Sequence, residues 1–184
     1  MNSTIKLPPS VVIKSMADVE EAAIALFASE IPLHDLLFLD RDIRQHKVIT
    51  AWREGTERGT VQSLVAVADG KIVATTAVIR DPLSWSAHVA EVRLLVLPGW
   101  RGKGVGRALL EASIDQSIAQ GVAKLTARMT PDQRGAITLF EESGFRGEAL
   151  LLDHVRDVDG GSHDLAILSL DVASAQARRS ALIE

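Results

Sequence analysis

Residues 91–107 read Glu-Val-Arg-Leu-Leu-Val-Leu-Pro-Gly-Trp-Arg-Gly-Lys-Gly-Val-Gly-Arg, a strand pattern followed by a glycine-rich turn. The apolar run from Val89 to Leu97 is nearly continuous, which is typical of a strand buried on both faces. Pro98 and Gly99 end this strand, because proline has no N–H for the ladder and glycine opens the turn. The stretch therefore predicts a buried strand that leads directly into a loop.

The loop carries three glycines at alternate positions, Gly102, Gly104 and Gly106. A helical apolar pattern follows at once, in Val105, Leu109, Leu110, Ile114 and Ile118. The glycines therefore lie at a helix start, where free N–H groups attract anions and the missing Cβ lets a phosphate approach. Positive side chains gather at the same end, namely Arg101, Lys103 and Arg107. We predict that this loop binds an anion.

Two common phosphate loops do not fit this segment. A Walker A loop needs Ser or Thr after Gly-Lys, whereas Gly104 follows Lys103 here. A dinucleotide fingerprint counted from Gly104 and Gly106 needs a small residue at Leu109 and an acid about 20 residues further on. Neither motif therefore describes this loop.

The pattern Arg-x-x-Gly-x-Gly, formed by Arg101, Gly104 and Gly106, resembles the acetyl-CoA signature of the GNAT family of N-acetyltransferases. A second block consists of Thr-Pro-Asp-Gln at 130–133 and Ala-Ile-Thr-Leu-Phe-Glu-Glu-Ser-Gly-Phe at 136–145. It looks like the Asn-x-x-Ala-x-x-Leu-Tyr-x-x-x-Gly-Phe segment of that family. The blocks have the order and separation of the family, and the resemblance covers most of residues 10–171.

The resemblance implies an α/β (α+β) GNAT fold: a mixed, mostly antiparallel sheet of about seven strands, with a central, splayed parallel pair flanked by helices. The residues agree, since a strand–helix–strand crossover from 89 to 129 makes its two strands parallel. We expect one domain at 10–171, an N-terminal tail at 1–9 and a C-terminal tail at 172–184. From residue 173 on, a short Ala-rich helix is the alternative to a frayed tail.

The remaining elements follow from local signals. We expect strands at 10–14, 61–68, 71–80, 123–129, 145–156 and 164–170, with hairpin turns at 69–70 and 159–161. A first helix starts at a capping box, Ser15-x-x-Asp18, and ends before Pro32, and a second helical stretch covers 33–52, ahead of a loop at 55–59. A further helix begins with Thr130 as the cap, Pro131 at the first helical position and Gln133 closing the box.

The resemblance also implies which residues bind acetyl-CoA. Backbone N–H groups of Leu95, Val96 and Leu97 are expected to face the thioester oxygen. The pyrophosphate is expected on the loop Arg101, Gly102, Lys103, Gly104, Val105, Gly106 and Arg107. Gln133 stands where the family has an Asn that bonds the cofactor. Phe140 stands where many members have the Tyr that protonates the leaving thiolate, and the chain has no tyrosine.

A general base is expected on the same strand. Glu91 is the carboxylate within the apolar run, and the structural alternative for it is an ion pair with Arg93. His88 is the second candidate base, and a water chain is the third possibility. The segment between the first two helices forms part of the acceptor site in the family, so His34, Asp35 and Asp40 either contact substrate or lie on a solvated face.

Composition narrows the class of protein further. The chain has 184 residues, 47% of them hydrophobic, no cysteine and a net charge of −4, which argues against broad nucleic-acid binding. No signal-peptide core or membrane-length apolar run is present. His154 and His163 lie near Asp153 and Asp164, but the spacing favours structural hydrogen bonds, so we expect no metal.

These observations predict a cytoplasmic, acetyl-CoA-dependent N-acetyltransferase that transfers the acetyl group directly to a primary amine of a small molecule or of a peptide or protein. We expect no nucleic-acid or membrane partner, and a homodimer is a possible assembly. The alternative is a CoA-binding regulatory module with a degenerate active site. A third hypothesis, a nucleotide-binding protein, requires ATP binding that acetyl-CoA does not displace.

Overall fold

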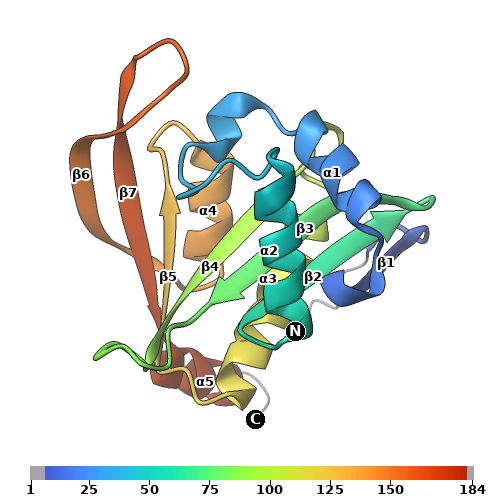
Figure 1. Ribbon diagram of the computed structural model, residues 1–184. Helices are drawn as coiled ribbons and strands as arrows, with labels where there is room; N and C mark the ends of the chain where they lie inside the picture. Colours follow the sequence, from blue (N-terminus) through green and yellow to red (C-terminus); the bar gives the residue numbers. More distant parts are fainter. Residues whose placement is uncertain (1–6, 182–184) are drawn as a thin grey trace.

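A computed structural model describes residues 7–181 of the chain, which form one seven-stranded sheet (Figure 1). The strand order is β1-β2-β3-β4-β5-β7-β6. The strands are β1 (Val11–Ser15), β2 (Val61–Ala68), β3 (Lys71–Ile79), β4 (Val89–Val96), β5 (Lys124–Met129), β6 (Arg146–Arg156) and β7 (Ser162–Asp171). Each pair of neighbours is antiparallel except β4 and β5. The predicted mixed, mostly antiparallel sheet of about seven strands is confirmed.

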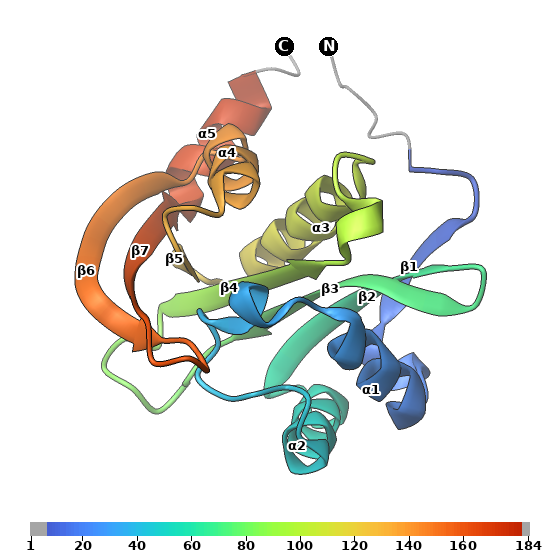
Figure 2. The same cartoon turned by 90° about the horizontal axis from the view of Figure 1, so that it is seen from above.

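Helices cover both faces of this sheet (Figure 2). The helices are α1 (Glu21–Glu30), α2 (His46–Glu57), α3 (Val105–Ala119), α4 (Arg134–Glu142) and α5 (Val172–Ala181), with short 3-10 turns η1 (Met16–Asp18), η2 (Leu33–Leu36) and η3 (Pro98–Trp100). In Figure 2, α1 and α2 lie on one face, while α3 and α4 lie on the other. The two faces therefore offer separate binding surfaces to a ligand that passes through the sheet.

The central pair, β4 and β5, runs parallel over three residue pairs and then separates. These pairs join Val89 to Lys124, Ala90 to Leu125 and Glu91 to Thr126. From there β4 continues along β3 as far as Val96, and β5 continues along β7 as far as Met129. The predicted splayed pair is confirmed, and a gap opens in the middle of the sheet.

Alternation along β4 assigns its side chains to the two faces. Val92 and Leu94 pack into the apolar cluster beneath α3 and α4, together with the buried Leu110 and Phe140. Leu95 packs on the other face, in the cluster that holds Phe27 of α1 and Ile49 of α2. Glu91 and Arg93 share that second face, because they differ from Leu95 by even numbers of residues. The strand predicted to be buried on both faces thus carries two charged side chains on its α1–α2 face.

The N-terminal helix begins later than predicted. Ser15 accepts a hydrogen bond from the Ala17 N–H, but this contact caps the short turn η1 rather than a long helix. An extended Val19 separates that turn from α1, whose N-cap is Glu20. The predicted end before Pro32 is confirmed, since Ile31 is extended.

The predicted second helical stretch at 33–52 is wrong in its first half. Residues 33–36 form η2, and the chain then crosses the sheet without regular structure until α2 starts at His46. Buried apolar side chains such as Phe38 and Ile43 hold this irregular path in place, and they produce the apolar spacing that imitated a helix. The helix continues to Glu57, so Gly55 is a buried helical residue packed against Val61 and not part of a loop.

The start of α4 also differs from the prediction. The helix begins at Arg134 with Gln133 as its N-cap, and Pro131 lies in the turn before it. Half of the predicted capping box is present, because the Gln133 Oε1 accepts a hydrogen bond from the Thr130 N–H at 3.1 Å. Thr130 does not cap the helix, since the Gln133 N–H closes a turn on the Thr130 carbonyl instead.

The C-terminal residues form α5, which is the helical alternative among the two predictions for this segment. Val172 and Ala175 are buried in the core beneath α3 and α4. No helix within residues 7–181 is long and apolar enough to cross a membrane. The predicted N-terminal tail lies mostly outside the described residues, which begin at Leu7.

Candidate active site

The glycine loop forms the start of α3, as the sequence predicts. Gly104 is the N-cap and has a φ of 79°, and Gly102 has a φ of 70°, both in the left-handed region that glycine adopts without strain. Nothing lies within 4 Å of the position that a Cβ would take at Gly102. The loop therefore leaves space in front of the first N–H groups of α3, which a phosphate can fill.

Gly106 has a different role from the other two glycines. A Cβ at this position would lie 3.2 Å from Val96 Cγ2 and 3.3 Å from Leu139 Cδ2. The missing side chain thus allows the first turn of α3 to approach β4 and α4 closely. Gly106 serves packing, whereas Gly102 and Gly104 shape the loop.

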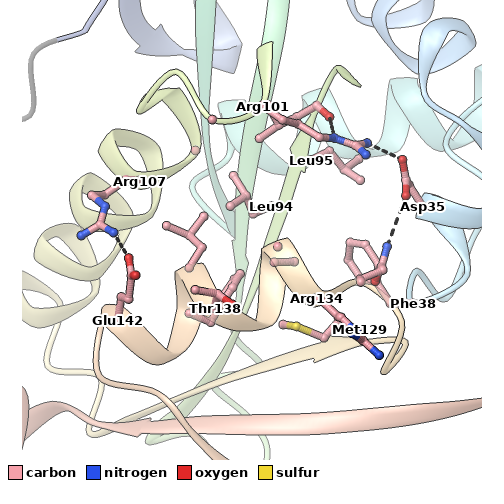
Figure 3. Close-up of a pocket in the computed structure, with 18 of the residues that line it drawn as sticks. Asp35, Phe38, Leu94, Leu95, Arg101, Arg107, Met129, Arg134, Thr138 and Glu142 are labelled. Atoms are coloured by element: carbon pink, nitrogen blue, oxygen red, sulfur yellow. Dashed lines mark hydrogen bonds and ion pairs between the residues drawn. The ribbon is translucent and has the colours of Figure 1, made fainter. Parts of the chain in front are cut away.

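The three cations of the loop each contact another side chain. Arg101 pairs with Asp35 at 2.5 Å and donates through Nε to the Val96 carbonyl, and Arg107 pairs with Glu142 of α4. The Lys103 ammonium lies 4.8 Å from the centre of the Trp100 ring. Figure 3 shows the two arginine–carboxylate pairs on opposite sides of a cavity. The arginines are therefore held at its rim, next to the glycine loop.

This cavity has a volume of about 750 Å³. Its walls come from the glycine loop, from β4, from the end of β5 and from α4, and include Leu94, Val96, Met129 and Leu139. Side chains from the η2 region, His34, Asp35 and Phe38, close one end. The cavity thus runs from the predicted anion site into the gap between the separated strands.

The backbone of β4 supplies one polar edge to this gap. The Leu97 N–H donates to the Val73 carbonyl at 3.0 Å, so it is used within the sheet and does not face a ligand, contrary to the sequence prediction. Neighbouring residues of a strand direct their backbone groups to opposite sides. Val96 therefore points its N–H toward the gap, in agreement with its carbonyl, which accepts from Arg101. Leu95 lies two residues before Leu97, opposite Thr75, so its N–H also faces β3 and not the gap, contrary to the prediction, and its side chain lines the cavity.

Gln133 lines the cavity, and its Nε2 donates a hydrogen bond to Asp35 Oδ1 at 3.5 Å. Next to it, His34 Nε2 lies 2.7 Å from Asp132 Oδ2. A hydrogen bond from the Thr130 side chain and the nearby His34 hold the pKa of Asp132 below its ordinary value, although partial burial acts in the opposite direction. A histidine paired with an ionised carboxylate thus lines the cavity, a pairing that the sequence does not reveal.

Phe140 is buried at 3% exposure and lines the same cavity. Its ring packs edge-to-face against Phe145, with 5.0 Å between the ring centres. Phe140 thus places an apolar ring where the family resemblance predicts the phenol of a tyrosine. No proton donor is available from this side chain.

Glu91 belongs to a cluster of four charged side chains that we call the charged quartet: Asp40, Glu91, Arg93 and Arg128. The Glu91 Oε1 accepts from Arg93 Nε at 2.7 Å and from Arg128 Nη2 at 3.0 Å. Asp40 bridges the outer ends of the two arginines through its two carboxylate oxygens, at 2.5 Å and 2.9 Å. The structural alternative foreseen for Glu91, an ion pair with Arg93, is therefore present.

The charges of the quartet stabilise one another. Partial burial acts to raise the pKa of Asp40, but hydrogen bonds and attraction from Arg128 and Arg93 hold it below its ordinary value of 3.8. Burial acts to lower the pKa of Arg128, but Glu91 and Asp40 raise it above the ordinary range. Asp40 and Arg128 are therefore held in their charged forms near the point where β4 and β5 separate.

A second cavity of about 420 Å³ lies on the α1–α2 face, between α2, the 39–43 segment and strands β2 to β4. Leu95 lines both cavities, Arg93 lines the second one and Arg128 lines the first. The charged quartet therefore stands at the boundary between them.

The two predicted bases lie in different places. Glu91 is at the boundary, on the inner side of the two arginines, and lines neither cavity. His88 is exposed and precedes β4 at its far end, where its carbonyl accepts from the Ala123 N–H. Sequence reasoning singled out His34, Asp35 and Asp40 as possible contacts, and the structure brings all three to the site. Sequence reasoning gave Arg128 no role, because the position of this residue in the sequence matches no motif.

Two of the residues considered around a metal site form hydrogen bonds with other side chains or backbone groups. His163 Nε2 lies 2.7 Å from Asp157 Oδ2, while Asp164 accepts a hydrogen bond from the Asp153 N–H. Within residues 7–181, no group of three or more potential ligands is close enough to hold a metal ion.

Comparisons with known proteins agree with this geometry. A sequence model of the acetyltransferase (GNAT) family matches residues 22–145. The chain therefore belongs to the GNAT family of acetyltransferases, a class that the fold and the glycine loop define together. No curated protein matches the sequence significantly.

Solved structures share the fold at low sequence identity. The putative acetyltransferase yncA from Salmonella typhimurium, solved with acetyl-CoA, is 22% identical, with a TM-score of 0.73 over 88% of this chain and 94% of that one. A ribosomal-protein-alanine N-acetyltransferase from Brucella melitensis is 21% identical, with a TM-score of 0.72 over 87% and 99%. A spermidine N-acetyltransferase chimera from Vibrio cholerae and hSSAT is 15% identical, with a TM-score of 0.69 over 91% and 98%. The acceptors named for these relatives differ, so the shared fold leaves the acceptor open.

Proposed function

We propose that this chain transfers the acetyl group of acetyl-CoA directly to a primary amine of a small molecule or of a peptide or protein. The observation that carries the proposal is the 750 Å³ cavity, which joins the glycine loop to the gap between β4 and β5. A long cofactor with a phosphate end and a thioester end fits this shape. A cytoplasmic location remains a prediction.

The residues of the cavity suit acetyl-CoA. Gly102 and Gly104 keep side chains away from the first N–H groups of α3, so the pyrophosphate can bind there, with Arg101 and Arg107 beside it. Apolar walls from Leu94, Val96 and Leu139 suit the pantetheine arm. When bound, acetyl-CoA supplies the acetyl group as an activated thioester.

The reaction requires two contributions from this chain. The Val96 N–H can stabilise the negative charge that develops on the carbonyl oxygen. A base must take the proton of the ammonium, since an alkylammonium with a pKa of about 10 has no free lone pair. The amine nitrogen then forms its bond to the carbonyl carbon as the carbon–sulfur bond breaks, and the thiolate takes up a proton.

Two groups at the site are suited to accept the amine proton. Glu91 lies at the boundary of the cavities and acts directly or through one water, as proposed from the sequence. His34, held by Asp132, lines the cofactor cavity itself. His88 is the least suited of the candidates, because it lies at the other end of β4.

The experiment combines binding and turnover. Calorimetry should give saturable binding of acetyl-CoA that excess ATP does not displace, and a panel of primary amines should release free CoA thiol in an amine-dependent manner. Thiol release without amine is the control for simple hydrolysis. Displacement by ATP would contradict the proposal and favour a nucleotide-binding protein.

One observation favours the second candidate, a CoA-binding regulatory module. Phe140 fills the place of the family's proton donor, and the chain contains no tyrosine to replace it. This candidate predicts acetyl-CoA binding without thiol release across the whole amine panel. Any amine-dependent turnover excludes it.

A further inference from the structure

The second cavity offers a mostly apolar surface next to the charged quartet. Its walls include Leu39, Ile43, Val48 and Leu95. Trp52 lines it as well, and its Nε1–H donates to Ser63 Oγ at 2.7 Å, so the indole needs no polar partner from a ligand. At about 420 Å³, the cavity falls within the size range of small-molecule sites.

The charged residues that line this cavity are Asp40, Arg41 and Arg93. Arg93 is a member of the charged quartet. Its side chain is 19% exposed, and that of Arg128 is 21% exposed. Guanidinium groups that are this far from water need anionic partners. Glu91 satisfies them from the inner side, and Asp40 satisfies them from the outer side.

Asp40 differs from the other three members, because its side chain is 57% exposed and comes from the irregular segment before α2. Its two oxygens each contact one arginine, which is how a pair of guanidinium groups holds a carboxylate. Both contacts of Asp40 use Nη2 groups, one from Arg93 and one from Arg128. Because Asp40 is exposed and comes from a segment without regular structure, its position is the one at which another carboxylate can reach both arginines.

We propose that the acceptor is a small amine that also carries a carboxylate and an apolar side chain, that is, a hydrophobic α-amino acid. Its carboxylate replaces that of Asp40 on Arg93 and Arg128, and its side chain occupies the apolar cavity. This inference rests on the proposed function and specifies its substrate class.

The geometry of an α-amino acid suits this boundary. Its amine is one carbon away from its carboxylate, so a carboxylate held at the quartet keeps the amine beside the cofactor cavity, which Arg128 lines. A polyamine has no carboxylate to place on Arg93 and Arg128. The quartet combines two arginines with two carboxylates, so the expected selection rests on the carboxylate of the acceptor.

The test compares three acceptors of equal side chain: L-leucine, L-leucinamide and 3-methylbutylamine, with spermidine as the cationic contrast. The second lacks the charge of the carboxylate and the third lacks the whole group. We expect kcat/KM for leucine to exceed each of the others by about tenfold or more, as is typical when a charge-assisted hydrogen bond is lost. Equal or higher kcat/KM for leucinamide, 3-methylbutylamine or spermidine would overturn the inference and leave acetyl transfer intact.

A variant pair assigns the preference to the quartet. Arg93→Met removes one guanidinium, and Arg44→Met removes a nearby exposed arginine that pairs with Asp42 outside both cavities. Arg93→Met should lower the ratio of kcat/KM for leucine to kcat/KM for 3-methylbutylamine about tenfold or more, because any loss shared by both amines cancels in the ratio, and Arg44→Met should leave this ratio unchanged. A leucine preference that survives in folded Arg93→Met would contradict the assignment.

If no amine is acetylated, a direct binding measurement still distinguishes the inference about the acceptor from the proposed acetyl transfer. Calorimetry of L-leucine with the protein and CoA measures acceptor binding without chemistry. Leucine binding that Arg93→Met weakens and Arg44→Met preserves would support the inference even though the proposed function had failed. Absence of leucine binding to the wild-type protein would overturn it.

Discussion

The cofactor cavity and the apolar cavity beside it are built in opposite ways. The anion-binding end of the first comes from seven consecutive residues, 101–107, whose geometry is set by glycines and a helix start. The boundary of the second is formed by the charged quartet, in which Asp40 and Arg128 are 88 residues apart in the sequence. One site is therefore local, and the other exists only when the sheet is assembled.

This difference separates two tasks. A contiguous loop offers backbone N–H groups, which suit an invariant pyrophosphate. The side chains of the quartet come from the segment before α2, from β4 and from β5. Each of them can change without altering the glycine loop, so they suit an acceptor that differs between relatives. Substitutions in the first region should therefore affect cofactor binding, and those in the second should affect turnover and acceptor choice.

The largest effect is expected from Glu91→Gln. The amide keeps the shape of the side chain but cannot accept the amine proton, so turnover should fall by about 10²–10⁴ while acetyl-CoA affinity persists. Initial rates across pH, together with calorimetry, measure both quantities. Glu148→Gln is the matched control, because Glu148 pairs with Lys124 on an exposed surface outside both cavities.

An unchanged rate and pH profile in Glu91→Gln would assign Glu91 a structural role. His34→Gln would then be the next variant to test, since His34 lines the cofactor cavity.

The second-largest effect is expected from Gly104→Glu, which places a negative side chain in the phosphate position. Acetyl-CoA affinity should fall more than tenfold, equivalent to more than ~1.4 kcal/mol, as measured by calorimetry. Gly70→Glu controls for backbone strain, because Gly70 has a φ of 78° in the hairpin between β2 and β3, close to the 79° of Gly104. Equal affinity in folded Gly104→Glu would remove the glycine loop from the cofactor site.

A smaller effect is expected from Phe140→Tyr, which adds a hydroxyl at the wall of the cofactor cavity. Turnover at saturating substrates should rise several-fold or more, but by no more than about 10², the lower end of the range of acid catalysis, because a thiolate leaves fairly well unaided. Acetyl-CoA affinity should change little, since the ring keeps its packing against Phe145. No gain in a folded variant would mean either that water already serves as the acid or that this pocket is not catalytic.

The smallest effect concerns stability and Asp40. The pKa of Asp40 is lowered from 3.8 in the folded protein, so its ionised form stabilises the fold above about pH 4, and this contribution is lost as pH falls through the lowered pKa. The melting temperature of the wild type should exceed that of Asp40→Asn slightly at pH 7, and the difference should shrink as the pH falls below about 4. The difference is small because water screens a side chain that is 57% exposed, and 1 M salt should reduce it further. A difference that grows toward low pH would contradict the ion-pair assignment.

The same contrast explains what could be predicted from the sequence. The Asp69-Gly70 hairpin and the glycine loop depend on the conformations of a few adjacent residues, and the structure contains both of them. The path of residues 37–45 could not be predicted, because Phe38 and Ile43 are buried by tertiary contacts that produce an apparently helical spacing. The quartet and the His34–Asp132 pair could not be found either, since no short spacing connects their members.

The short ladder between β4 and β5 has a consequence for cooperativity. Three residue pairs join the four-stranded part of the sheet to the part formed by β5, β7 and β6, so separating these two parts breaks few backbone hydrogen bonds. Amide exchange should therefore report this seam as an early opening event within the sheet. A ligand that bonds to both edges of the gap adds its binding free energy to the cost of opening the seam. If acetyl-CoA binds as proposed, it should therefore slow amide exchange along β4 and β5.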